Sequence, residues 1–326
     1  MQYPITRNRR LRRTEAIRNM AAEINITAND FIVPLFLTEG SDVKENIPSM
    51  PGYFRYSLDG LNEELDMIQD LSLNAILIFV KVPNDKKDNQ GTEAVNSSGL
   101  MQESIRYIKK QAPDLLVMSD IALDPYSVYG HDGVVTDNEI VNDPTLEVLS
   151  QMALSHAEAG ADFVAPSDMM DGRIGAIRNA LDEKGFINTG IMSYTAKYAS
   201  GFYGPFREAL DSTPGFGDKK TYQMDTRNSR EAIKEALMDQ DEGADILMVK
   251  PALPYLDIIS EMRAKTHLPI AAYQVSGEYS MIKAAAENGW LDNDSAMMET
   301  VISIKRAGAD FIASYFAKEV CTLLNN

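Results

Sequence analysis

The sequence predicts a (β/α)8 barrel with an extended N-terminal arm. Three observations predict it: eight short apolar runs follow one another, segments with helical spacing separate them, and one helix-to-strand joint occurs three times. A chain of 326 residues allows one large α/β barrel or two smaller domains. We expect an arm over residues 1–30 and a single catalytic domain over residues 31–326.

The candidate strands are mostly continuous apolar runs rather than alternating ones. This pattern is typical of parallel strands that are covered on both faces. The runs are FIVPLFL (31–37), AILIFVKV (75–82), LLVMSDIAL (115–123), DFVAPSD (162–168), GIMSYTA (190–196), ADILMVKP (244–251), PIAAYQVS (269–276) and DFIASYF (310–316).

Helical spacing is clearest in LNEELDMIQDL, LMQESIRYIKKQ, LEVLSQMALSHAEAG and SREAIKEALMDQDEG. The repeated joint reads EAGADFV, DEGADIL and RAGADFI. In each copy a glycine (Gly160, Gly243 or Gly308) fits the left-handed position that ends a helix, and two residues follow before a strand begins. An open, doubly wound sheet is the alternative. No G-x-G-x-x-G follows the first strand, so its nucleotide-binding form has no support.

Composition excludes several classes of function. The net charge of −17 argues against a nucleic-acid-binding face. No apolar run of about 18 residues is present, so we expect no membrane span. The N-terminus lacks the apolar core of a secretory signal. Cys321 is the only cysteine, which excludes an internal disulfide and a cysteine zinc cluster. We expect a cytoplasmic protein without an organic cofactor.

A basic segment, RNRRLRRTEAIR at 7–18, interrupts the acidic trend. It is a solvated tail, an organelle transit peptide, or an arm that docks on an acidic surface. Leu11, Ile17 and Met20 continue a helix-like spacing through it. We favour the docking arm, with another copy of the same chain as its acidic partner.

Lys250, at the end of the apolar run ILMVK, is the strongest chemical signal. Active sites of such barrels lie at the C-terminal strand ends. Burial lowers the pKa of a lysine, and a neutral amine attacks ketones to form a Schiff base. Lys197 ends a different strand and can supply a second cation or a second amine. The alternative is that both side chains extend to solvent or pair with carboxylates.

Further polar residues follow the strands and fill a long loop. Asp120, Ser167, Ser276 and Tyr315 occupy strand ends, where ordinary hydrogen bonding is the alternative to substrate binding. The segment 198–229 is rich in glycine and aromatic residues and is a candidate lid. Its cations suit substrate carboxylates, unless the loop is merely solvated. They are Arg207, Lys219 and Lys220.

The segment DIALDPYSVYGHDG at 120–133 holds three aspartates and His131. Carboxylate ligands suit magnesium rather than zinc. An ordinary polar turn is the alternative. His156 and His267 show no ligand spacing and are expected to be structural.

Long stretches of the chain resemble the porphobilinogen synthase (5-aminolevulinate dehydratase) family. They are MVKPALPYLDII, SYTAKYASGFYGPFREA, PSDMMDGRIGAIR and YQVSGEYSMIKAAAENGW, and the resemblance also includes the arginine-rich arm. It implies the barrel, the arm, and condensation of two 5-aminolevulinate molecules to porphobilinogen in tetrapyrrole synthesis, with loss of water.

The resemblance also implies roles for individual residues. Lys250 is the Schiff-base lysine, Lys197 is the second active-site lysine, and Asp120 assists proton transfer. Substrate binding falls in two groups that hold the two carboxylates, with two further contacts. The groups are Ser276 with Tyr315, and Arg207 with Lys219 and Gln223; the further contacts are Ser167 and Tyr203.

The metal site departs from the zinc-dependent members of the family, which carry three cysteines after Asp120. Ala122, Asp124 and Asp132 stand at those positions, so no thiolate zinc site is expected. The sequence resembles the aspartate-type branch, with Asp124 and Asp132 as candidate ligands and an activating, allosteric magnesium at Glu235. The family's usual assembly implies a homo-octamer that is built from dimers, and the arms join the two chains of each dimer.

Two other functions remain alternatives. A class I aldolase is also a Schiff-base barrel, but it needs a sugar-phosphate site, whereas these cations and hydroxyls suit two carboxylates. A binding protein that kept the fold would not need Lys197, Lys250, Arg207 and Ser276 together.

Overall fold

The computed structural model describes residues 2–325 and forms a closed barrel of eight parallel strands. Each barrel strand pairs with the next one along the chain, and pairing of the last with the first closes the ring. The predicted strands are confirmed, with ends that differ by at most two residues. They are β1 (Phe31–Thr38), β4 (Ala75–Lys81), β5 (Leu116–Ile121), β8 (Phe163–Pro166), β9 (Gly190–Lys197), β10 (Ile246–Lys250), β11 (Ile270–Gln274) and β12 (Phe311–Ser314).

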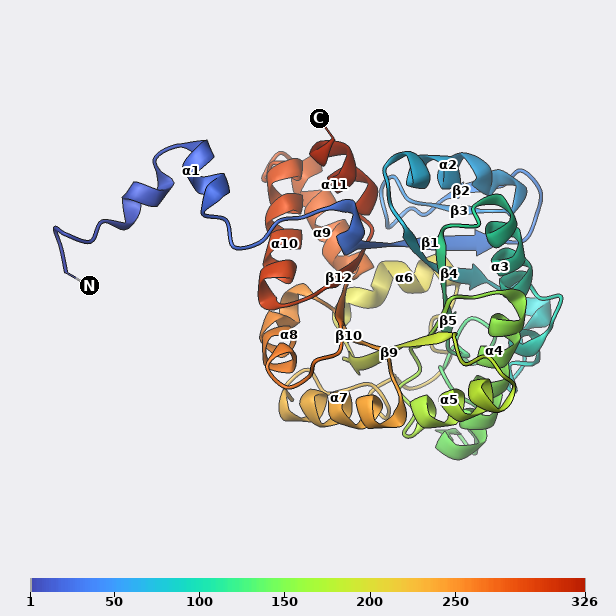
Figure 1. Ribbon diagram of the computed structural model, residues 1–326. Helices are drawn as coiled ribbons and strands as arrows, with labels where there is room; N and C mark the ends of the chain where they lie inside the picture. Colours follow the sequence, from blue (N-terminus) through green and yellow to red (C-terminus); the bar gives the residue numbers. More distant parts are fainter. Residues whose placement is uncertain (1, 326) are drawn as a thin grey trace.

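Helices cover the outside of this barrel, as the view along it shows (Figure 1). The outer helices are α2 (Asn62–Asp70), α3 (Leu100–Gln111), α4 (Asn142–Ala159), α5 (Arg173–Glu183), α7 (Arg230–Glu242), α8 (Leu256–Arg263), α9 (Ser276–Glu287), α10 (Asn293–Ala307) and α11 (Ala317–Leu324). One short helix, α6 (Gly204–Leu210), instead lies inside the ring of helices in that view. It belongs to the predicted lid, in which the sequence pattern did not indicate a helix.

The three repeated joints end their helices as predicted. Gly160 and Gly243 both have φ of 105°, and Gly308 has φ of 122°. These angles lie in the region that glycine adopts without a steric penalty. Each joint therefore turns the chain from an outer helix back into the barrel.

Strand residues are buried on both faces, which explains their continuous apolar pattern. Every residue of β10 and β11 is buried, and in β4 only Lys81 is partly exposed. One face packs inside the barrel and the other packs under the helices. A lysine at the end of such a strand therefore has its backbone and the first part of its side chain shielded from water.

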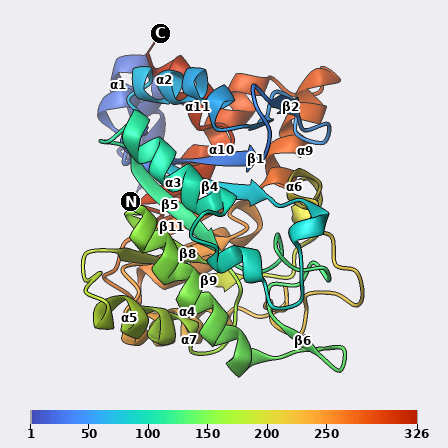
Figure 2. The ribbon, with the colours of Figure 1, turned by 90° about the vertical axis from the view of Figure 1, so that its right-hand side faces the viewer.

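Short elements decorate the barrel. Hairpins join β2 (Lys44–Asn46) to β3 (Phe54–Tyr56) and β6 (Val135–Thr136) to β7 (Glu139–Ile140). The second hairpin projects near α4 in the rotated view (Figure 2). Single 3-10 turns are η1 (Asn8–Arg12), η2 (Ala28–Asp30), η3 (Asp59–Leu61), η4 (Asn84–Lys86), η5 (Thr92–Val95), η6 (Gly201–Tyr203) and η7 (Leu253–Tyr255).

The N-terminal segment extends away from the barrel (Figure 1). It contains η1 and the helix α1 (Glu15–Met20). Leu11 and Met20 are 62% and 88% exposed, so the helix-like spacing does not bury an apolar face within the chain. Among the described residues, no helix has the length and apolar character needed to cross a membrane.

Candidate active site

Two lysines meet at the C-terminal ends of neighbouring strands. Lys197 is the last residue of β9 and Lys250 is the last residue of β10, and the two are paired in register. This is the end of the barrel at which enzymes of this architecture place their catalytic groups. The predicted meeting of the two lysines is present in the structure.

A bulge in β9 decides which side chains face the lysines. Ser193 pairs with Leu247 and Ala196 pairs with Val249, so β9 uses one residue more than β10 over this stretch. Residues three apart on a regular strand face opposite sides. Here Ser193 bonds Asp239 of the outer helix α7, whereas the next residue, Tyr194, contacts Lys250. The extra residue lets Tyr194 and Lys197 both lie on the lysine side.

Lys250 sits in an aromatic cage and is 4% exposed. Its Nζ lies 4.5 to 5.4 Å from four ring centroids, those of Tyr273, Phe206, Tyr194 and Tyr203. Burial, together with the cation of Lys197, lowers the pKa of Lys250 to about 7. A substantial fraction of this amine is therefore neutral near pH 7.

Lys197 and Asp120 complete the buried centre. The Nζ of Lys197 donates a hydrogen bond to the backbone carbonyl of Ser167 and lies 3.9 Å from Asp132. Burial and the neighbouring Asp124 raise the pKa of Asp120 to about 7. Asp120 can therefore gain or lose a proton at neutral pH, as a general acid or base requires.

Lys219 neutralises the other two aspartates. Its Nζ lies 3.4 Å from Asp124 and 3.2 Å from Asp132. Burial alone would raise the pKa of Asp132, but Lys197 and Lys219 lower it to about 2. Within residues 2–325, no group of three or more His, Cys, Asp or Glu side chains has the geometry to hold a metal. The Lys219 ammonium thus lies between Asp124 and Asp132, the two carboxylates that the sequence suggests as metal ligands.

The predicted lid is seated on the barrel mouth. The Tyr203 hydroxyl donates to the Lys250 carbonyl at 3.2 Å, and the Phe206 amide donates to Ser276 Oγ at 2.9 Å. Gly277 permits close approach, because a Cβ there would lie 2.5 Å from the Phe202 carbonyl oxygen. Arg55 donates to the Ala209 carbonyl at 2.9 Å at the end of α6. The lid is therefore held by contacts along its length.

A small hollow of about 20 Å³ lies between the lid and the lysines. Its walls are Asp120, Asp124, Ser167, Lys197, Tyr203, Phe206, Arg207, Lys219, Gln223 and Lys250. Such a volume holds about one water molecule. Most of the predicted catalytic and binding residues thus converge in one place.

Ser276 and Tyr315 do not line this hollow. Ser276 is buried and accepts from the lid, and the Tyr315 hydroxyl lies 2.9 Å from the Tyr273 hydroxyl. Phe206 connects the two places, since its ring contacts Lys250 and its amide bonds Ser276. The Ser276 hydroxyl accepts from this amide and keeps its own O–H to donate to a carboxylate.

Glu235 lies outside the barrel on α7. Its Oε1 is 3.2 Å from Arg173, a fully buried guanidinium that also lies 3.2 Å from Asp239. The side chain of Glu235 is 18% exposed. Burial raises the pKa of Glu235, although Arg173 opposes this effect.

The three histidines lie in different surroundings. His131 is buried, and its ring nitrogens lie 3.0 Å from the Tyr222 hydroxyl and from the Phe216 carbonyl of the lid. His156 is buried beside Ser119, and His267 is exposed.

The aromatic cage around Lys250 and the burial of Arg173 could not be predicted from the sequence pattern. Tyr194, Phe206 and Tyr273 read as ordinary core residues, because nothing in their spacing shows which face of a strand or loop they occupy. Arg173 followed a turn in a helical pattern and gave no sign of burial. The position of Tyr194, three residues before Lys197, places it on the opposite face of a regular strand, so its spacing gave no signal either.

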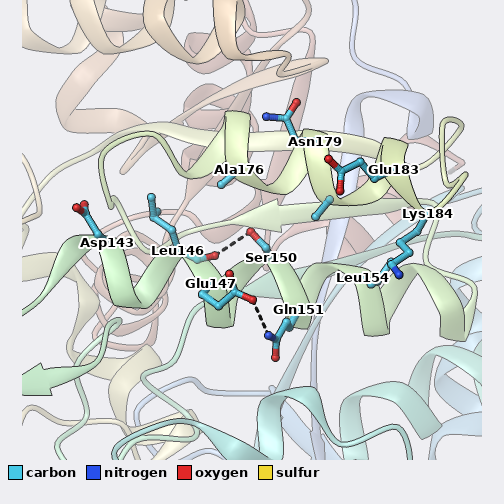
Figure 3. Close-up of a pocket in the computed structure, with 11 residues that line it drawn as sticks. Asp143, Leu146, Glu147, Ser150, Gln151, Leu154, Ala176, Asn179, Glu183 and Lys184 are labelled. Atoms are coloured by element: carbon cyan, nitrogen blue, oxygen red, sulfur yellow. Dashed lines mark hydrogen bonds between the residues drawn. The ribbon is translucent and has the colours of Figure 1, made fainter.

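A second hollow, of about 450 Å³, lies on the outside of the barrel between α4 and α5 (Figure 3). Its side chains include Asp143, Glu147, Glu183 and Lys184. Gln151 donates to Glu147 at 2.7 Å within α4. This groove is built by two outer helices and lies away from the strand ends, so we do not assign the chemistry to it.

Fold and site together define a (β/α)8-barrel enzyme with two buried lysines at the C-terminal ends of its strands. The family model described as delta-aminolevulinic acid dehydratase matches residues 5–323. The chain belongs to this family, also called porphobilinogen synthase, and is a lyase of porphyrin biosynthesis.

Individual relatives agree over almost the full length. The chain is 52% identical to a delta-aminolevulinic acid dehydratase of Halalkalibacterium halodurans, over 98% of this chain and 97% of that protein. It is 53% identical to that of Methanothermus sociabilis, over 98% and 99%. A crystal structure of the Toxoplasma gondii enzyme with its product porphobilinogen matches with a TM-score of 0.96 and 47% identity, covering 99% of this chain and 92% of the other.

Proposed function

We propose that this enzyme joins two 5-aminolevulinate molecules into porphobilinogen through a Schiff base on Lys250. The observation that carries the proposal is the buried Lys250 amine, caged by aromatic rings beside Lys197, with its pKa lowered to about 7. Only the neutral amine is a nucleophile toward a ketone. Burial of the amine and the neighbouring cation of Lys197 both favour that form.

The Schiff base explains why a lysine is used. The Lys250 nitrogen attacks the keto carbon of one substrate, and the keto oxygen leaves as water. The resulting iminium acidifies the adjacent carbon and activates the former carbonyl carbon. Formation of the C–C and C–N bonds of a pyrrole needs both effects. Asp120, whose pKa is raised to about 7, is the nearby group suited to move the protons.

Two binding places follow from the positions of the cations and hydroxyls. Arg207, Lys219 and Gln223 share the hollow with Lys197, and we assign them to one substrate carboxylate. Ser276 and Tyr315 are assigned to the other. Ser167 and Tyr203 complete the walls. The two lysines then serve two differently held molecules, as an asymmetric condensation requires.

Reductive trapping tests this proposal. Borohydride added with 5-aminolevulinate is expected to fix one substrate on Lys250, seen as an added mass on the peptide that contains it. Lys250→Met is expected to lose turnover and the adduct, whereas Lys220→Met, an exposed lid residue, keeps both. Full turnover in Lys250→Met together with no adduct in the unaltered enzyme would reject the proposal.

We also assign the chain to the aspartate-type branch of the family. Ala122, Asp124 and Asp132 stand where the zinc-dependent members carry cysteines. Zinc at structural sites prefers thiolate and imidazole. This place has no thiolate, and both ring nitrogens of its one imidazole, His131, contact Tyr222 and Phe216. With Lys219 between them, Asp124 and Asp132 do not fit a metal in this arrangement either.

Glu235 is our candidate for an activating magnesium. It is partly exposed, and magnesium commonly binds one or two carboxylates while keeping several waters. Chelator treatment followed by magnesium is expected to change the sedimentation of the enzyme and its activity. Glu235→Gln should lose both responses, whereas Glu231→Gln on the same helix keeps them. Equal responses in both variants would remove Glu235 from this role.

The arm supports an assembly of several chains, for which we propose an octamer in the cytoplasm. Arg9, Arg10, Arg12 and Arg13 are exposed on it beside Leu11 and Met20. The rest of the chain is strongly acidic, so a second copy offers a complementary surface. Burying Leu11 and Met20 between copies would contribute hydrophobic stabilisation as well.

A further inference from the structure

The hydroxyl of Tyr194 lies buried at the catalytic lysine without any use in the site described so far. Tyr194 is 0% exposed, and its hydroxyl has no hydrogen-bond partner within residues 2–325. Buried hydroxyls nearly always have a partner, and leaving one without costs stability. A group kept in this condition invites a functional explanation.

The position of Tyr194 points to the reacting atoms. Its ring centroid lies 5.0 Å from Lys250 Nζ. After burial, the groups that most affect its pKa are Asp120, Tyr315 and Tyr203, which all lie at the barrel mouth. Asp120 is itself incomplete, because its Oδ1 is buried without a hydrogen-bond partner among the described residues. Two side chains close to Lys250 therefore carry an unpaired donor and an unpaired acceptor.

We propose that Tyr194 is a catalytic residue that donates a hydrogen bond to the substrate's keto oxygen while Lys250 attacks the keto carbon. The inference rests on the Schiff-base function proposed above and deepens it. It assigns to Tyr194 the stabilisation of the oxygen on which negative charge develops.

The step balances without any outside reagent. The Lys250 lone pair forms the C–N bond, and the carbon–oxygen π pair moves to the oxygen. A proton passes from nitrogen to that oxygen, which gives a carbinolamine. Protonated Asp120 then gives a proton to the hydroxyl, which leaves as water while the nitrogen lone pair forms the iminium. Tyr194 keeps its proton throughout, since burial holds its pKa well above the usual value.

The bulge in β9 makes this arrangement possible. Without the extra residue, Tyr194 and Lys197 would face opposite sides of the strand. With it, β9 supplies both the second lysine and the hydroxyl. The structure thus gives the irregularity of the strand a chemical consequence.

Tyr194→Phe tests the proposal, because it removes only a hydroxyl that has no partner. Turnover is expected to fall on the order of a hundredfold, with KM changed by less than about threefold. In rapid mixing with borohydride, trapping of 5-aminolevulinate on Lys250 should slow by a similar factor. The melting temperature should stay the same or rise, since the unpaired group is gone.

Tyr56→Phe is the matched control. Tyr56 is also buried, but its hydroxyl bonds Glu64 at 3.0 Å, away from the lysines. This variant should lose stability and keep its turnover, the reverse of Tyr194→Phe. Normal turnover and trapping in Tyr194→Phe, or a melting temperature lowered as in Tyr56→Phe, would overturn the role of Tyr194. Failure of the unaltered enzyme to trap substrate on Lys250 would instead reject the Schiff-base function itself.

Discussion

Lys197 and Lys250 lie opposite each other, paired in register as the final residues of β9 and β10. The positive charge of Lys197 lowers the pKa of Lys250. Burial is the main cause that lowers the pKa of Lys250 to about 7, and it adds to the effect of Lys197. The pair therefore favours a neutral amine at Lys250.

Lys197→Met should make Lys250 harder to deprotonate. Burial lowers the pKa of Lys250 most and Lys197 next, so removing Lys197 raises that pKa. The amine is protonated below its pKa, so the acid limb of substrate trapping moves to higher pH. Trapping at pH 7 should fall on the order of tenfold. A pH series of borohydride trapping measures this, with Lys220→Met as control, and an unmoved acid limb contradicts the prediction.

Lys219→Met should destabilise the enzyme on the order of 3 kcal/mol at pH 7, because Asp124 and Asp132 lose their closest cation. Lowering of the Asp132 pKa to about 2 stabilises the fold above the unfolded pKa of about 4. That contribution disappears as pH falls from about 4 to 2. The difference in the free energy of unfolding between the unaltered enzyme and Lys219→Met should therefore become smaller over this pH range. Urea unfolding at several pH values can measure it.

The matched control for that measurement is Lys220→Met, whose side chain is 73% exposed. Its effect should stay within about 0.5 kcal/mol. An equal loss of stability in Lys219→Met and Lys220→Met would mean that the buried contacts of Lys219 with the two aspartates do not stabilise the fold.

Gly277→Ala should lift the lid. The new Cβ meets the Phe202 carbonyl oxygen at 2.5 Å, and backbone cannot yield as a flexible side chain does. We expect faster proteolysis within 198–229, a raised KM and weaker protection by substrate. In Gly201→Ala the Cβ meets nothing within 4 Å, so this variant should behave like the unaltered enzyme. Identical cleavage of all three proteins would argue against a seated lid.

Removal of residues 2–20 should reduce the size of the assembly without unfolding the barrel. The removed segment has few contacts with the barrel and exposes Leu11 and Met20. Sedimentation velocity measures the assembly, and circular dichroism checks the fold. If the shortened protein still sediments as an assembly of the same number of chains, the arm has no role between copies.

The barrel was predictable because its signals are local. Each buried strand is a continuous apolar run, and in each repeated joint a glycine marks the end of the helix. Lys250 was predictable for the same reason, since a lysine that ends such a run must lie at the barrel mouth. Converging side chains from different strands followed from the topology once the strands were ordered.

The aromatic cage and the lid helix were not predictable in this way. Phe206 reaches Lys250 only because α6 folds back over the mouth, a long-range packing that no spacing encodes. The bulge that turns Tyr194 inward depends on the register between two strands. Lys219 between two aspartates likewise joins positions about 90 residues apart.

The extra residue of β9 relative to β10 must be kept if this site is grafted onto an idealised scaffold. A designer who copied the lysine pair onto uniform strands would keep Lys197 beside Lys250 but turn Tyr194 toward the outer helices. The irregular strand must be transplanted together with its side chains.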